Sequence, residues 1–136
     1  MLLIYDGQCG FCVRSAAWIK ARLPETARVE PWQSLPLERL GLTRADAQSC
    51  VWWIEGADLE SAEVAGGTDD HAAVSPAKFS GSDAIGRSLV AAGGIWAAVG
   101  KVVIHPPGRW LAAPAYSLIA ANRHRLSRLG NIRRAH

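Results

Sequence analysis

The sequence predicts an α/β fold in which a small mixed sheet is flanked by helices and followed by a helical C-terminal extension. Short apolar runs alternate with segments of helical periodicity along most of the chain. A Cys-x-x-Cys pair, Cys9 and Cys12, lies where the first apolar run meets the first helical segment. The 136 residues and the hydrophobic content of 49% suit a single domain over residues 1–136, with residues 95–136 as the basic extension.

The first strand and the first helix are predicted by residues 2–23. Residues 2–5 are apolar and predict a short buried strand, and a helix is expected from residue 9 or 10 to residue 23. Pro24 ends this helix, because the residue before a proline disfavours helical geometry. Cys12 shares the apolar face of the helix with Ala16, Ile19 and Leu23. We therefore expect Cys12 to be buried and Cys9 to be exposed at the helix tip.

The middle of the chain predicts two further strands and short helical segments. Residues 27–32 alternate apolar and polar side chains and predict a second strand, with a proline at its end. Leucines within residues 35–42 predict one or two helical turns, and residues 43–46 resemble the capping box of another helix. Residues 50–54 are mostly β-branched or aromatic and predict a central strand.

The last part of the chain predicts a loop, a short ordered segment and three helices. Residues 55–75 are acidic and small and predict a loop, after which order returns at residues 77–80. Ser82 and Asp83 predict the N-cap of a helix over residues 84–92. Two more helices are expected over residues 95–104 and 109–129, with Pro114 disturbing the entry of the second. We expect their apolar residues to face the domain and their arginines to face solvent, with the inward set including Leu111, Leu118, Ile119 and Leu126.

The cysteine pair points to redox chemistry. A helix N-terminus carries partial positive charge and unpaired N–H groups, so a thiolate is favoured over a thiol there. Only the thiolate attacks a disulfide. Residues three apart lie on neighbouring positions of a helix, so a disulfide can close within one turn. The pattern predicts Cys9 as the nucleophile and Cys12 as the resolving thiol.

Two other interpretations of the pair remain open: a metal-binding dithiol, and inert buried thiols. A structural zinc site usually has four ligands, often two such pairs or one pair with two spaced histidines. Cys50 is the one further cysteine, and the four histidines lack the spacing of a zinc site. We therefore expect no metal and no cofactor.

The predicted order of strands and helices is that of a thioredoxin-like domain. Tyr5-Asp6-Gly7-x-Cys9-x-x-Cys12 resembles the signature of the DCC family of predicted thiol-disulfide oxidoreductases. Further segments also resemble that family, namely Trp32-Gln33-Ser34, Ser82-Asp83-Ala84 and Tyr116-x-x-Ile119-Ala120-x-Asn122-Arg123-x-Arg125. The resemblance implies a thioredoxin-like fold and thiol–disulfide redox activity. One departure is that residues 48–50, before the central strand, contain no proline.

Several residues beyond the dithiol are candidates for the site. Asp6 lies three residues before Cys9, where its carboxylate can form a cap or turn or accept a proton during thiol exchange. We expect four further residues to bind substrate, namely Gly10, Phe11, Ser49 and Trp32. Trp32 could instead belong to the core. Cys50 either faces the dithiol as a third thiol or points into the core.

Charge and composition limit the partners. Residues 1–83 contain twelve acidic and seven basic residues, whereas residues 84–136 contain eight basic and no acidic residues. This asymmetry permits an alternative function, a non-catalytic module that binds a partner through its basic C-terminal helices. We expect internal charge balance instead, with no nucleic acid partner.

Location and substrate follow from the same features. The longest uncharged apolar stretch, residues 88–100, has 13 residues, too few for a membrane span. No signal peptide is evident, and three cysteines do not form a secreted disulfide framework, so we expect a cytoplasmic protein. Its expected substrate is a disulfide-containing protein or a small thiol compound.

Overall fold

The computed structural model describes residues 1–56 and 76–132. Most of the predicted loop over residues 55–75 and the side chain of Leu126 lie outside the described residues. The elements follow in the order β1 (Leu2–Tyr5), α1 (Gly10–Lys20), β2 (Arg28–Pro31), a 3-10 turn (Trp32–Ser34), α2 (Arg44–Ser49), β3 (Trp52–Glu55), β4 (Ala77–Ser80), α3 (Gly81–Ala92), α4 (Gly94–Ile104) and α5 (Gly108–Ile132).

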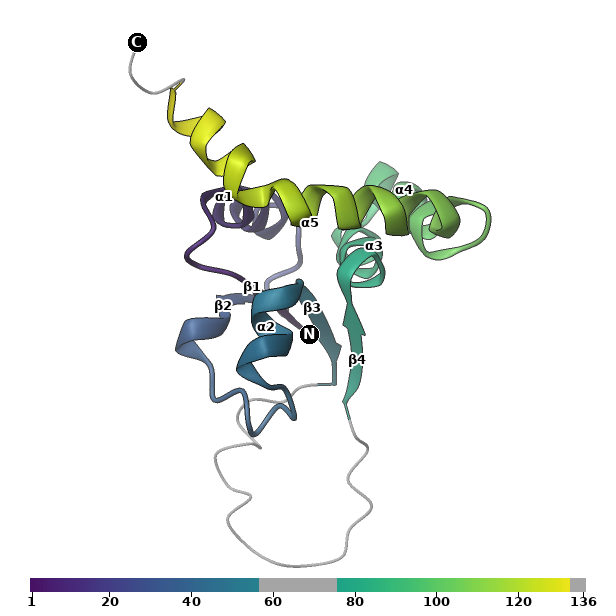
Figure 1. Ribbon diagram of the computed structural model, residues 1–136. Coiled ribbons are helices and arrows are strands. Elements are labelled where there is room, and N and C mark those ends of the chain that lie inside the picture. Colours follow the sequence, from purple (N-terminus) through teal and green to yellow (C-terminus); the bar gives the residue numbers. More distant parts are fainter. Residues whose placement is uncertain (57–75, 133–136) are drawn as a thin grey trace, which may run out of the picture.

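The four strands form one mixed sheet in the order β2-β1-β3-β4. β1 pairs with β2 in parallel, and β3 pairs antiparallel with both β1 and β4. This order confirms the predicted central position of β3 and the thioredoxin-like α/β fold. β1 and β3 are inner strands, and β1 leads through a short turn into α1 (Figure 1). Cys9 and Cys12 lie at the start of this helix.

The strand alternation divides the core between the two faces of the sheet. Leu2 and Ile4 point to the face covered by α2, whereas Leu3 points to the face covered by α1 and α3. Ile54 and Trp53, neighbours on β3, divide in the same way, and both are fully buried. Successive side chains of a strand point to opposite faces, so each strand contributes to both cores.

The helix boundaries follow local signals with two differences from the sequence prediction. Thr43 caps α2 through a complete capping box with Asp46, as predicted. α1 ends at Lys20, earlier than expected. α3 begins at Gly81, directly after β4, and not after the predicted cap at Ser82. Gly81 has a φ of 59°, and its N–H donates to the carbonyl of Val51 at 2.9 Å, so the chain turns from strand to helix three residues earlier than predicted.

The C-terminal helices form as predicted, but α5 presents a different face to the domain. Leu111 and Leu118, predicted to be buried, are 74% and 67% exposed. The half-buried residues instead include one i, i+4 row, Ala112, Tyr116 and Ala120. The prediction is therefore wrong for Leu111 and Leu118, because the Tyr116 hydroxyl anchors α5 by accepting the Val51 N–H before β3. Ile119, also predicted to face inward, does border the interior of the domain.

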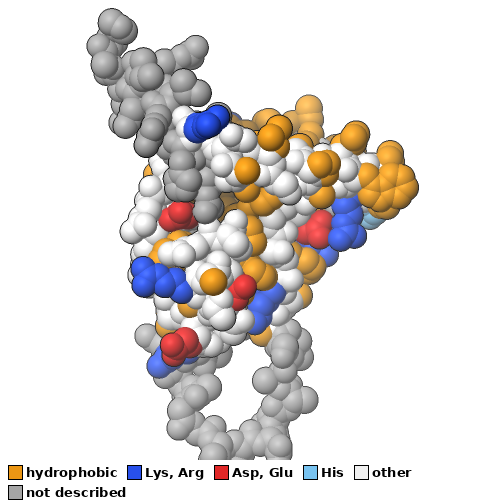
Figure 2. Space-filling view, viewed as in Figure 1, with side chains coloured by type: hydrophobic (Ala, Val, Ile, Leu, Met, Phe, Trp, Pro, Cys, Tyr) orange, Lys and Arg blue, Asp and Glu red, His pale blue; other side chains and the backbone are white. Residues whose placement is uncertain are grey.

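Apolar side chains remain on the outside of α4 and α5. Figure 2 shows hydrophobic side chains gathered along α5 and around its junction with α4. Arg109 of α5 pairs with Asp83 of α3 at 3.4 Å, and Arg87 of α3 pairs with Glu55 of β3 at 3.1 Å. Among the described residues, no helix combines the length and the apolar character required to cross a bilayer.

Candidate active site

Cys9 is the N-cap of α1, at the point where β1 and its following turn meet the helix. Its backbone is extended, with φ −92° and ψ 106°, and its carbonyl accepts the N–H of Val13 at 2.9 Å. The Cys9 Sγ atom accepts the N–H of Cys12 at 3.4 Å. A sulfur thus occupies the capping position that serine, threonine or aspartate oxygen commonly fills.

The burial of the two thiols is the reverse of the sequence prediction. Cys9 is 1% exposed, whereas Cys12 is half-buried. The Cys9 thiol folds back over the first turn of α1 to reach the Cys12 N–H, which removes it from solvent. Cys12 does lie on the predicted helix face with Ala16 and Ile19, but that face borders a cavity near Cys12. None of the three cysteines forms a disulfide in this structure.

The turn before the dithiol is held by Asp6 and Gln33. One carboxylate oxygen of Asp6 accepts the N–H of Gln8 and the side-chain N–H of Gln33, both at 3.0 Å. The side-chain oxygen of Gln33 accepts the N–H of Gly7 at 3.1 Å. Asp6 therefore forms a turn and does not cap α1, while its own carbonyl accepts the Cys9 N–H at 3.3 Å. Gln33 joins the end of β2 to the dithiol turn.

A cavity of about 360 Å³ lies beside the dithiol. Its walls come from β1, α1, the segment before β3, α3, α4 and α5. Three polar residues near the dithiol end, Asp6, Cys12 and Cys50, border it together with Phe11. Cys50 lines the cavity that Cys12 also lines, and its sulfur lies 4.0 Å from the Asp46 carbonyl of α2. That this thiol faces the dithiol stays a prediction.

The other predicted substrate-binding residues are placed differently. Gly10 is the first residue of α1 and lies next to Cys9. Ser49 is exposed, and its hydroxyl donates to the Asp46 carbonyl at 2.8 Å and to the Cys50 sulfur at 3.4 Å. Ser49 adjoins the cavity wall without lining it.

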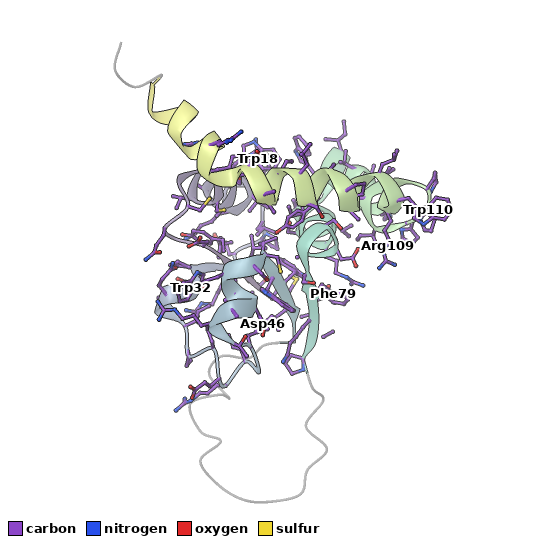
Figure 3. All side chains as sticks on the ribbon, in the orientation of Figure 1. Trp18, Trp32, Asp46, Phe79, Arg109 and Trp110 are labelled. Atoms are coloured by element: carbon purple, nitrogen blue, oxygen red, sulfur yellow. The ribbon has the colours of Figure 1, made fainter. Side chains whose placement is uncertain are left out.

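Trp32 is not part of this site. It is 6% exposed and belongs to the core on the α2 face of the sheet, with the guanidinium of Arg44 5.1 Å from its ring centre. β2 aligns Pro31 with Tyr5, a cavity residue, so the next residue turns to the opposite face. In Figure 3, Trp18 lies where α1 meets α5, whereas Trp32 lies beside α2.

The backbone of Val51, in the cavity wall before β3, is already hydrogen-bonded on both sides. Its N–H donates to the Tyr116 hydroxyl at 3.0 Å, and its carbonyl accepts the Gly81 N–H at 2.9 Å. These bonds tie α5 and the start of α3 to the segment that follows Cys50. Although residues 48–50 contain no proline, the backbone N–H and carbonyl of the next residue, Val51, are therefore both already hydrogen-bonded within the protein.

The family comparison agrees with this geometry. The family model for DCC1-like thiol-disulfide oxidoreductases matches residues 3–129. The chain belongs to this family. Membership supports a general role in thiol–disulfide exchange for this DCC1-like protein, whose two motif cysteines lie within one helical turn of each other. No curated protein and no solved structure matches the chain.

Sequence reasoning missed the residues that the fold brings to the cavity from a distance. These include Trp18, Trp96 and Tyr116, which belong to three different helices of the DCC1-like chain. The sequence contained a weak signal for Tyr116 and for Gln33, since both belong to segments that resemble the family. It contained none for the tryptophans. Within residues 1–56 and 76–132, no three His, Cys, Asp or Glu side chains are grouped as a metal site would require.

Proposed function

We propose that this protein is a dithiol–disulfide oxidoreductase in which Cys9 and Cys12 interconvert between two thiols and one disulfide. The observation that carries the proposal is the Cys9 sulfur at the N-cap of α1, 3.4 Å from the Cys12 backbone nitrogen. Helix N–H groups directed at a sulfur favour its anionic form. The proposed substrate is a disulfide, and the proposed compartment is a reducing cytosol.

The proposed reaction proceeds in two exchanges. The Cys9 thiolate attacks one sulfur of the substrate disulfide, forms a mixed disulfide and expels the other substrate half as a thiolate. The Cys12 sulfur then attacks Cys9, which closes the protein disulfide and releases the second half. Two electrons pass from the protein to the substrate, and each released thiolate takes up one proton. Asp6, which borders the same cavity as Cys12, is the proposed proton acceptor for the Cys12 thiol.

The order of the two thiols can be tested separately from the activity. The cap position favours Cys9 as the attacking group, whereas exposure favours Cys12, because Cys9 is 1% exposed. If Cys9 attacks first, a Cys12→Ser variant should accumulate a mixed disulfide with substrate, detectable by mass spectrometry. Accumulation on a Cys9→Ser variant instead would reverse the proposed order and leave the redox pair itself intact.

Turnover distinguishes an enzyme from the other interpretations of the dithiol. A Cys9→Ser variant should lose disulfide reduction while retaining its fold, since serine is also a good N-cap residue. Ala115→Ser, at an exposed position of α5 that does not line the cavity, is the control and should retain turnover. Equal turnover of Cys9→Ser and the unaltered protein would contradict the proposal. Stoichiometric zinc in the reduced protein, lost in Cys9→Ser, would favour a metal-binding dithiol.

One observation supports a second candidate, a binding module that acts through the C-terminal helices. Ile95 and Trp110 are 75% and 73% exposed, and the basic side chains of Lys101 and Arg109 lie in the same two helices. Exposed apolar residues of this size mark an interaction surface when they are contiguous. This candidate gains if the Cys9→Ser variant retains full function in a cell that requires the protein.

A further inference from the structure

The cavity beside the dithiol is apolar along most of its length. Asp6 is the one charged residue among the described residues that line it. The Asp6 carboxylate accepts the N–H of Gln8 and the side-chain N–H of Gln33. The hydroxyl of Ser88 donates to the Ile85 carbonyl at 2.7 Å. The wall therefore offers few polar groups that a ligand could pair with. A charged ligand would therefore gain little binding free energy in this cavity.

The cavity is elongated along α1. Cys12, Ser15, Ala16, Trp18 and Ile19 all line it. A helix rises about 1.5 Å per residue, so residues 12 to 19 extend over about 10 Å. The dithiol is at one end of this length, and aromatic side chains are at the other.

Two tryptophans pack against each other at the far end of the cavity. The rings of Trp18 and Trp96 meet edge to face with their centres 4.8 Å apart. The Arg22 guanidinium lies 3.8 Å from the centre of the Trp18 ring and donates to the Trp18 carbonyl at 2.6 Å. These contacts hold the Trp18 ring in place and make an apolar wall.

The wall next to Cys50 is poorly suited to an extended peptide. Peptides that add to a strand edge need an unpaired backbone N–H and carbonyl to bind. At Val51 the N–H is bonded to Tyr116 and the carbonyl to Gly81. A peptide would have to displace α5 or the start of α3 to pair with Val51. Recognition through an apolar group in the cavity requires no such displacement.

We propose that the cavity binds the apolar substituent of a low-molecular-weight disulfide and thereby places the disulfide bond at the Cys9–Cys12 pair. The inference rests on the proposed function and adds the class of substrate. For a substrate R–S–S–R′, the reduced protein becomes the Cys9–Cys12 disulfide and releases R–SH and R′–SH. The cavity volume of about 360 Å³ lies within the range of small-molecule sites, about 300–1,000 Å³.

A homologous series of substrates tests this proposal. The probes are mixed disulfides that release the same leaving group, pyridine-2-thione, and carry an ethyl, butyl or hexyl group. A fourth probe carries an anionic sulfonatoethyl group. Pre-reduced protein, freed of reductant, is mixed with each probe and the thione is followed in a single turnover. The second-order rate constant should rise by up to about fourfold for each methylene that enters the cavity, and the sulfonate should be slowest.

Filling the cavity should remove this dependence on chain length. Ala120→Phe places a large side chain in the cavity wall on α5, so the ratio of the hexyl to the ethyl rate should fall towards one. Ala115→Phe makes the same substitution at an exposed position of the same helix that does not line the cavity. This control should keep the ratio of the unaltered protein.

The possible outcomes separate the two proposals. Equal rates across the alkyl series, with thione release that still depends on the dithiol, would overturn the cavity proposal and leave the oxidoreductase function standing. A peptide with a thiopyridyl-activated cysteine that reacts faster than the hexyl probe would also overturn it. Thione release at the same rate from the Cys9→Ser, Cys12→Ser and unaltered proteins would contradict the oxidoreductase function itself.

Discussion

The two faces of the sheet are built from the same strands but serve different purposes. On the α2 face, Leu2, Ile4 and Ile54 form a core with the leucines of residues 35–42. This core contains none of the cysteines. On the other face, Leu3 and Trp53 are equally buried, but α1, α3 and α5 enclose a cavity there. Strand alternation therefore supplies apolar surface to both faces, and the helices that cover each face decide whether it is filled.

The difference arises from how each covering helix is held. α2 is short and is fixed by its own cap, so the leucines around it close over the sheet. α5 contacts α1, α3 and α4 and is bonded to the sheet through the Tyr116 hydroxyl. From this helix, Ala120 lines the cavity together with Tyr116 and Ile119. A site can thus be formed where a helix is held at a distance from the core by a specific polar contact.

The largest expected effect concerns the filled face. Ile54→Ala should lower the free energy of unfolding by about 2–5 kcal/mol, because the side chain is fully buried and leaves a cavity behind. For Leu89→Ala, at the cavity wall, the loss should be near the lower end of this range, since part of the Leu89 surface already faces empty space. Urea denaturation measures both, with Ile54→Val as a milder variant. Only Leu89→Ala should alter how the rate of thione release depends on the alkyl chain length of the probe. If Ile54→Ala altered this dependence as well, the proposed distinction between the two faces would be wrong.

A smaller effect is expected at the cap of α2. Thr43→Ala removes the hydroxyl that accepts the Asp46 N–H at 3.1 Å and should cost about 1 kcal/mol of stability. Thr43→Ser keeps the hydroxyl and is the control. Thione release should be unchanged, because Thr43 lies on the α2 side of the sheet, outside the dithiol cavity. A change in release rate would show that the two faces are coupled.

The smallest effect is the pH dependence of the same cap. The Thr43 hydroxyl and, next, the Thr43 N–H bond to the carboxylate and lower the pKa of Asp46 in the folded protein. The ordinary value is about 3.9, so this contribution to stability is present above about pH 4 and is lost as the pH falls through the folded-state pKa. Urea midpoints of the unaltered protein and Asp46→Asn should therefore converge in acid. A constant difference between pH 3 and pH 7 would contradict this assignment.

Local signals predicted most of the elements. The apolar run before Asp6 gave β1 at its observed bounds, and the Thr43–Asp46 pattern gave the start of α2. Caps and strand alternation depend on neighbours within a few residues, so they can be recognised without knowledge of the fold. The dithiol at the start of α1 was predicted for the same reason.

The orientation of α5 could not be predicted in this way. The helix is apolar on several sides, so burying Leu111 and Leu118 seemed as favourable as burying Ala112 and Tyr116. The bond from the Val51 N–H to the Tyr116 hydroxyl joins residues 65 positions apart. Periodicity contains no information about such a contact, which selects one face among several apolar ones.

By itself, the sequence determined the strand and helix order, the Cys9–Cys12 pair at a helix start and the resemblance to a redox family. Only the tertiary structure decided that Cys9 is buried, that Cys12 and Cys50 border one cavity, and that Trp32 lies on the opposite face. The physical reason is the range of the interactions. Elements and caps are set by bonds between near neighbours, whereas a cavity exists only where helices distant in sequence meet.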